Sequence, residues 1–257
     1  MRKALIFILS LPIATAWAET ADVLEYQVHE AGSPPYTSRF LVTPRWLRLD
    51  QGEGSDGYLL YDRRTGVIHD VSDEDRTVLE IDPPRAGRSP PQGMRLEIVP
   101  IADPEAPTIA GIAPRHYRLR AGGGECQEIV VLPGVMDSAV KAWREFIARL
   151  ADQQALELSA GPSAGEDACD LLTHVYAPEK GLKLGLPVFW HIPRKDRALQ
   201  DYAQDRKVDD ALFRLPKGYR RMGLPQAANP PPASSRNRRA GRPTTQERGS
   251  RKRRAIQ

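Results

Sequence analysis

The sequence lacks an apolar run long enough to cross a bilayer. Its most apolar stretch, residues 4–16, falls short of the roughly 20 residues that a transmembrane helix needs. With 23 prolines and 20 glycines, the chain also lacks the uninterrupted helix-forming stretches of a helical bundle. We therefore expect many short elements and turns. At 257 residues and 40% hydrophobic, the chain is large and apolar enough to bury a core.

The start of the chain has the pattern of a cleaved secretory signal. Arg2 and Lys3 precede the apolar stretch, which ends at Ala16-Trp17-Ala18, the small-x-small pattern that signal peptidase accepts. No cysteine lies beside this point, which argues against a lipid anchor. We predict that residues 1–18 are removed and that the mature protein is soluble and exported to the periplasm.

Cysteine is scarce, and this scarcity permits only one disulfide. An oxidising compartment favours pairing Cys126 with Cys169 and disfavours a reduced catalytic thiol. The bond would close a loop of about 43 residues and stabilise the fold by roughly 3 to 4 kcal/mol in the chain-entropy model. Two unpaired buried thiols remain the alternative.

Metal-binding and phosphate-binding patterns are missing as well. The acidic cluster Asp70, Asp73, Glu74 and Asp75 lacks the twelve-residue spacing of a calcium loop. Gly122-Gly123-Gly124 lacks the lysine and following helix of a phosphate-binding loop, so it predicts a hairpin turn. We expect no metal and no cofactor, because no H-x-H or H-E-x-x-H spacing relates the five histidines, which are His29, His69, His116, His174 and His191.

One motif of nucleophilic catalysis is present, in the wrong surroundings. Residues 161–165 match G-x-S-x-G around Ser163, and Asp167, Asp170, His174 and His191 follow in the order of α/β-hydrolases. That motif needs a buried parallel strand before it and a long helix after it. Here it follows a predicted helix and contains a proline. We predict a linker between helices in a chain that is not an enzyme, with a hydrolase using Ser163 as the alternative.

Positive charge is concentrated at the end of the chain. The net charge is +4, yet residues 226–257 carry +8, and residues 19–225 carry −6 once Arg2 and Lys3 leave with the signal. This Pro/Arg-rich tail has almost no apolar residues, so we predict that it is disordered. In the periplasm it would bind an anionic membrane surface or lipopolysaccharide, and nucleic acid only if the chain is not exported. Its basic residues are Arg236, Arg238, Arg239, Arg242, Arg248, Arg251, Lys252, Arg253 and Arg254.

The first half of the chain has the pattern of successive strands. Short segments of alternating polarity recur about every ten residues and are separated by turn-forming residues. This spacing predicts an antiparallel sheet rather than βαβ units. The predicted strands are 23–29, 39–42, 46–50, 58–61, 67–71, 77–81, 94–100, 116–119 and 127–132.

Two helices follow. Val140, Trp143, Ile147 and Leu150 form an apolar stripe on a helix capped by Asp137 or Ser138, and its other face is charged. A shorter helix is expected over 166–176, a strand over 182–192, and one or two strands within 202–214. The predicted fold is α+β: a large curved antiparallel sheet, or half-barrel, over residues 19–225, with two helices packed on one face.

Three stretches give the chain a family resemblance. Residues 45–50, 57–62 and 66–70 look like paired hairpins, Gly185-Leu186-Pro187-Val188 like a late "G-x-P" strand, and residues 212–219 like a closing "F-x-x-P-x-G-Y". Together they resemble the LolA and LppX lipoprotein-carrier-like superfamily over about residues 20–222. The chain departs from it by lacking a lipobox cysteine and by adding the basic tail.

The resemblance implies a concave apolar surface for a lipid acyl chain or a partner segment, bound without catalysis. Trp46, Trp143 and Trp190 fill the core between sheet and helices or line this ligand groove. A structural envelope protein that binds only its neighbours is a further alternative. The sequence does not indicate an oligomeric state.

Overall fold

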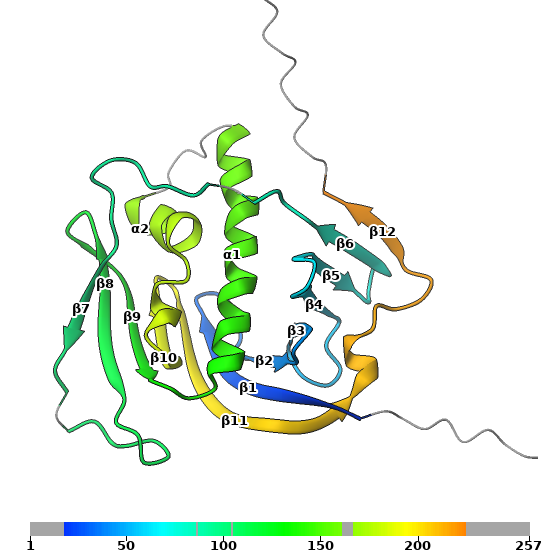
Figure 1. Cartoon of the computed structure of the whole chain (residues 1–257), viewed down its shortest axis with the longest axis horizontal. Coiled ribbons are helices and arrows are strands. Elements are labelled where there is room, and N and C mark those ends of the chain that lie inside the picture. Colours follow the sequence, from blue (N-terminus) through cyan, green and yellow to red (C-terminus); the bar gives the residue numbers. More distant parts are fainter. Residues whose placement is uncertain (1–17, 86, 104, 161–166, 225–257) are drawn as a thin grey trace, which may run out of the picture. The chain divides into compact units, whose positions relative to one another are not determined.

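The computed structural model describes residues 18–85, 87–103, 105–160 and 167–224, which form an α+β fold (Figure 1). Residues 1–17 of the predicted signal peptide, Ser163 and the tail of residues 226–257 lie outside these residues. The strands are β1 (Ala18–Glu30), β2 (Tyr36–Val42), β3 (Trp46–Asp50), β4 (Gly57–Asp62), β5 (Ile68–Ser72), β6 (Thr77–Ile81), β7 (Glu97–Ile101), β8 (Arg115–Ala121), β9 (Gly124–Leu132), β10 (Leu186–Ile192), β11 (Lys195–Asp209) and β12 (Arg220–Gly223). The helices are α1 (Asp137–Ala160), α2 (Ala168–Asp170), the π-helix η1 (Leu171–Tyr176), and the 3₁₀ turns η2 (Gly181–Lys183) and η3 (Asp210–Phe213).

All twelve strands belong to one sheet, in the order β12-β6-β5-β4-β3-β2-β1-β11-β10-β9-β8-β7. Neighbours are antiparallel, except that β12 lies parallel to β6. The first six strands form a meander, and β7 to β11 form the second half. The pairing of β1 with β11 joins the halves, so the N-terminal strand lies at the centre of the sheet.

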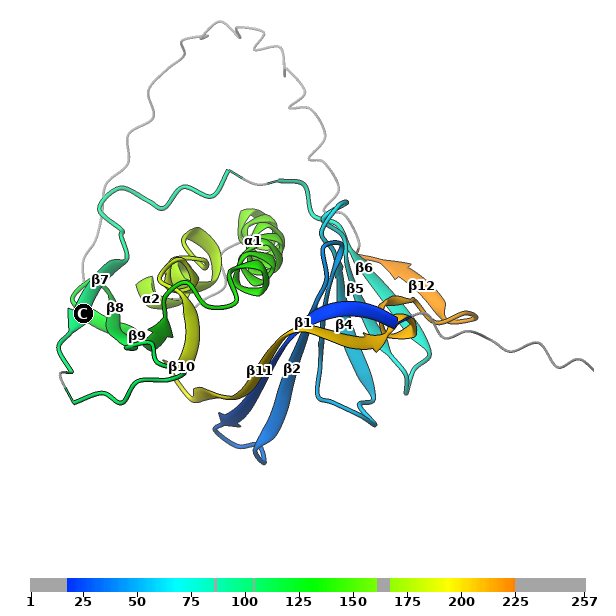
Figure 2. The same ribbon diagram turned by 60° about the horizontal axis from the view of Figure 1, so that its bottom comes forward.

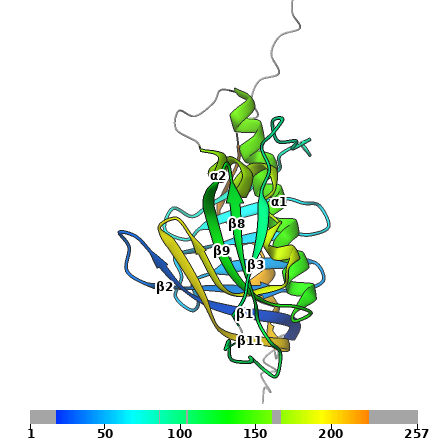
Figure 3. The same ribbon diagram turned by 90° about the vertical axis from the view of Figure 1, so that its left-hand side faces the viewer.

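The sheet is strongly curved. The two central strands, β1 and β11, are the longest, with 13 and 15 residues, and their register shifts twice. Such irregularities bend a strand and increase its twist. Figure 2 shows α1 and α2 on one side of the sheet, between β7–β10 and β2–β6. In Figure 3, β8 and β9 run across the direction of the strands behind them. The predicted half-barrel architecture is confirmed.

The main core lies on the concave face, here called the inner face, under α1. Val140 and Trp143 of the predicted apolar stripe are buried there, and Ile147 and Leu150 pack against the same core. The sheet contributes side chains at alternate positions, including Tyr26 and Phe40, because alternate residues of a strand share a face. Within the described part of the chain, no helix is long and apolar enough to cross a membrane.

A smaller core covers the opposite, outer face of the β1–β4 region. Here Phe213 of η3 packs on Val23, Leu41 and Leu60. After η3 the chain continues to β12, which adds to the edge strand β6 through main-chain pairing from Arg220 to Gly223. The sequence predicted strands within 202–214 but not this parallel strand, because four mostly exposed residues carry no alternation of polarity.

Three further elements differ from the prediction. Strand β10 begins at Leu186 rather than at residue 182, because residues 181–183 form the 3₁₀ turn η2. Strand β11 begins at Lys195, seven residues before the predicted start, because the charged residues Lys195, Asp196 and Arg197 interrupt the apolar pattern. The predicted second helix has only three α-helical residues, and the rest is π-helix. Gly122 and Gly123 form the predicted turn between β8 and β9, with φ of 57° and 85°.

Gly185 is the position where the backbone most requires glycine. It has a φ of +144°, and a Cβ there would lie 2.5 Å from the Leu132 carbonyl oxygen, where β10 meets β9. We expect Gly185→Ala to lower the free energy of unfolding by about 1–3 kcal/mol, measured by urea denaturation. Gly223→Ala is the control, because a Cβ there meets nothing within 4 Å. Equal stability of the two variants would contradict this expectation.

Candidate ligand-binding site

A cavity of about 160 Å³ lies on the inner face beside α1. Its walls come from α1, from η1 and from strands β9 to β11, so segments far apart in sequence meet there. One wall is the apolar stripe of α1, and the opposite wall consists of side chains that point inward from the strands. The lining residues are Gln127, Trp143, Ile147, Leu150, Gln154, Thr173, His174, Pro178, Trp190, Ile192, Lys195 and Arg197.

Two of the three tryptophans singled out from the sequence meet in this cavity. The ring centroids of Trp143 and Trp190 are 5.6 Å apart. Trp143 is 2% exposed and also packs on Phe40, at 4.5 Å between centroids. Trp190 donates its indole N–H to Gln127 at 3.3 Å, which fixes the orientation of the ring and satisfies its polar atom. The two rings give the cavity a rigid apolar wall.

Trp46 does not belong to this cavity. It packs against the outer-face core, and the Arg45 guanidinium lies 4.4 Å from its ring centroid. The next residue, Leu47, is fully buried in the inner core. Because successive side chains of a strand point to opposite faces, Trp46 is directed away from Trp143 and Trp190. Placing all three tryptophans in one groove was therefore wrong for Trp46.

A second, wider hollow of about 520 Å³ lies over the inner face of β2 to β5. We call it the open groove. Lys195 and Arg197 of β11 line both the cavity and the open groove. The remaining lining residues are Tyr36, Ser38, Leu49, Asp50, Gln51, Ser55, Asp56, Gly57, Tyr58, Leu59, Asp70, Val71 and Ser72.

The two basic residues shared by these hollows are in different electrostatic states. Lys195 Nζ lies 3.0 Å from Glu30 Oε2, and its hydrogen bond lowers the pKa of that carboxyl group. Tyr36 also donates to Glu30, at 3.0 Å. Arg197 forms no ion pair with any carboxylate of the described residues, and burial lowers the pKa of its guanidinium. Its Cζ lies 5.7 Å from the ring centroid of Trp143.

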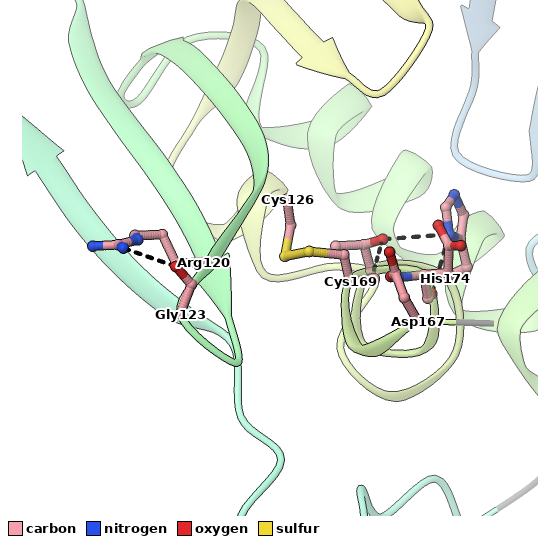
Figure 4. The surroundings of a disulfide bond; sticks show 8 residues. Arg120, Gly123, Cys126, Asp167, Cys169 and His174 are labelled. Atoms are coloured by element: carbon pink, nitrogen blue, oxygen red, sulfur yellow. Dashed lines mark hydrogen bonds between the residues drawn. A yellow bond between two sulfur atoms is a disulfide. The ribbon is translucent and has the colours of Figure 1, made fainter. Parts of the chain in front are cut away.

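The disulfide between Cys126 and Cys169 confirms the predicted pairing. It joins β9 to α2, with 5.1 Å between the Cα atoms (Figure 4). Thr173 donates its hydroxyl to the Cys169 carbonyl at 2.7 Å, and Thr173 and His174 both line the cavity. The disulfide therefore anchors the helical wall of the cavity to the sheet.

Other candidate chemistry is dispersed. The linker with Ser163 lies outside the described residues. Three histidines lie beside carboxylates: His116 by Glu128, His69 by Glu80 and His191 by Asp196. His174 is beside the Asp170 carbonyl, and His29 and His191 border one shallow pocket. Within residues 18–224, gaps excepted, no group of three or more His, Cys, Asp or Glu residues is arranged to hold a metal ion.

Sequence reasoning missed Lys195 and Arg197. Residues 193–201 were assigned to no element, since charged and apolar residues do not alternate cleanly there. The signal that was available is the i, i+2 spacing of the two basic residues, which places both on one face of a strand once the strand is extended.

No family model and no curated protein matches the chain. An uncharacterized conserved protein from Thermus thermophilus is similar in structure, with a TM-score of 0.39 and 10% identity, over 79% of this chain and 90% of that chain. PNGF-II is similar with a TM-score of 0.37 and 11% identity, over 80% of this chain and 31% of that chain. Both similarities are distant, and neither assigns the chain to a family; the resemblance to the lipoprotein-carrier-like superfamily stays a prediction.

Proposed function

We propose that this chain is a periplasmic, non-catalytic binding or carrier protein for the acyl chain of a lipid-like ligand. The observation that supports this proposal is the apolar cavity between α1 and the sheet, lined by Trp143 and Trp190. Cavities of this kind, mostly apolar with a few polar groups, are the usual form of a small-molecule site.

The size of the cavity limits what enters it. At about 160 Å³ it is close to an apolar protein cavity that holds one benzene molecule. It therefore accepts about six carbons of a chain rather than a whole lipid. The remainder of a longer ligand would lie toward the open groove, which has about 520 Å³ and shares Lys195 and Arg197 with the cavity.

The basic tail adds a second element to the proposal. Residues 226–257 would direct the carrier to anionic surfaces, at about 1 kcal/mol for each basic residue near a charged membrane. The tail lies outside the described residues, so this part of the proposal depends on its composition alone.

The test of the acyl-chain site uses uncharged ligands. We expect the mature full-length chain to bind 1-alkanols, as measured by calorimetry and by tryptophan fluorescence. Affinity should rise about fourfold for each added methylene, because each buried methylene contributes about 0.8 kcal/mol. The increase should level off after about six carbons, when the cavity is filled.

A matched pair of variants locates the site. Leu150→Trp fills the cavity and should weaken binding of 1-hexanol by about tenfold or more, which is about 1.4 kcal/mol. Leu158→Trp makes the same change on the same helix, outside the cavity, and should leave the affinity unchanged. Absence of alkanol binding to the native chain, or equal loss in both variants, would overturn the proposed function.

A further inference from the structure

Arg197 lies where the cavity meets the open groove. In the antiparallel ladder it is opposite Val28 of β1 and Trp190 of β10. Residues opposite each other share a face, and Val28 is fully buried in the inner core. The guanidinium is therefore directed to the inner face, next to the ring of Trp143.

The charge of Arg197 is unbalanced. Arg197 is half-buried, and removing part of a cation from water is unfavourable unless a carboxylate or hydrogen-bond acceptor compensates it. Its neighbour Lys195 is already paired with Glu30. Among the described residues, no carboxylate forms an ion pair with Arg197. Burial lowers the pKa of Arg197 and is the larger effect, although Glu30, which Lys195 already holds, is near enough to raise that pKa. The positive charge of Arg197 is thus available at the mouth of the cavity.

The acidic residues of the open groove come from β3, from the segment before β4 and from β5, whereas Arg197 comes from β11. Asp50 is held by Arg39 and Arg48, at 2.9 and 2.6 Å, so its charge is compensated. Asp70 lies on β5, where burial raises its pKa, and Asp56 precedes β4. An anionic group is therefore favoured at Arg197 and disfavoured further along the groove.

We propose that Arg197 binds the carboxylate of a single-chain fatty acid whose hydrocarbon end occupies the cavity beside Trp143 and Trp190. This inference rests on the proposed function, because it assigns the headgroup of the same ligand. A guanidinium matches a carboxylate in charge and in fork geometry. The single charge of the guanidinium matches one negative charge, which favours a carboxylate over a doubly charged phosphate monoester.

Octanoate and 1-octanol, which have the same chain length, separate the headgroup from the chain. We expect the mature full-length chain to bind octanoate at least about tenfold more tightly than 1-octanol, as expected for a hydrogen bond to a charged group. Arg197→Met should abolish this preference and leave the affinity for 1-octanol unchanged. Arg206→Met is the matched control: Arg206 is exposed on the same strand, opposite Ala21 of the outer-face core.

The outcomes distinguish the two proposals. Binding of 1-octanol without preference for octanoate overturns the role of Arg197 and leaves the acyl-chain site intact. An equal loss of both ligands in Arg197→Met also overturns it, since the residue would then act only by packing on Trp143. Binding of neither ligand to the native chain overturns the proposed function itself. Because the preference is measured on the native chain, the test holds even where Arg197→Met does not fold.

Discussion

Replacing Arg149 by methionine is expected to lower the free energy of unfolding by about 3–5 kcal/mol, the range found when a buried ion pair loses one partner. Only 8% of the Arg149 side chain is exposed. From α1 it donates hydrogen bonds to the Gly66 carbonyl at 3.0 Å, to Asp152 at 2.9 Å, to Asp82 at 3.3 Å and to the Pro83 carbonyl. Methionine fills a similar volume and satisfies none of these acceptors.

The cost is large because the acceptors have few other partners in the described part of the chain. Asp152 is 6% exposed and, among the described residues, would keep only Arg88, at 3.0 Å. Arg88 also donates to the Val175 carbonyl at 3.0 Å, so the segment after β6 is tied to both α1 and η1. Loss of Arg149 leaves a buried carboxylate with one of its two cationic partners and leaves two carbonyls without their donor. Buried acceptors without a donor lower stability by their full desolvation penalty. Loss of Arg149 also loosens the segment that holds α1 on the sheet.

Urea denaturation followed by far-UV circular dichroism measures this effect. The control is Arg144→Met, on the same helix and with the same change of charge. Arg144 Nε has no hydrogen-bond partner among the described residues, so its loss should change stability by less than about 1 kcal/mol. If both variants lose the same stability, the network around Arg149 contributes nothing specific.

The helix that carries Arg149 shows which parts of the fold are predictable from the sequence. The stripe through Trp143 and Leu150 predicted the buried face of α1. A helix that buries one face carries apolar residues at helical spacing along it, and this spacing can be read from the sequence. The other face of α1 was predicted only to be charged, and Arg149 was not singled out. Its partners Asp82 and Pro83 are distant in sequence, and nothing in local composition marks a charged residue that will be paired and buried.

Most strands of the sheet were also predictable from periodicity, but the pairing of strands distant in sequence was not. Alternation of polarity located β1 to β6, whose hairpin partners are adjacent in sequence. The pairing of β1 with β11 and of β12 with β6 joins distant segments, and local pattern carries no information about it. In β11 the charged residues around Arg197 concealed the start of the strand.

Only some residues of the candidate site were predicted from the sequence. Trp143 and Trp190 were singled out as large aromatic residues that would fill the core or line a ligand groove. Trp46 was grouped with them, although strand alternation places it opposite Leu47 of the inner core. The register between strands, which decides the face, was not available from composition. Arg197 was missed because what distinguishes it is that it forms no ion pair with a carboxylate of the described residues. Only the folded arrangement shows this.

Removal of the disulfide is the second change with a large expected effect. The double variant Cys126→Ser, Cys169→Ser should lose about 4 kcal/mol of unfolding free energy, because the bond spans 43 residues and the entropy of the opened loop increases with its length. Urea denaturation with and without dithiothreitol measures it. The native chain should lose stability with the reductant, and the double variant should not respond. A native chain that is equally stable under both conditions would contradict the prediction.

The same disulfide connects stability to the proposed function. Cys169 belongs to α2, and the hydroxyl of Thr173 hydrogen-bonds to its carbonyl just before His174, so the bond positions one wall of the cavity. The other walls, from α1 and β10, belong to the main core and do not depend on it. We therefore expect the oxidised chain to bind 1-hexanol more tightly than the reduced chain under conditions where both remain folded. The preference of octanoate over 1-octanol should persist in both, because Arg197 is held by β11 and by Trp143. Loss of affinity with retention of that preference would show that chain and headgroup are bound by separately anchored parts of the fold.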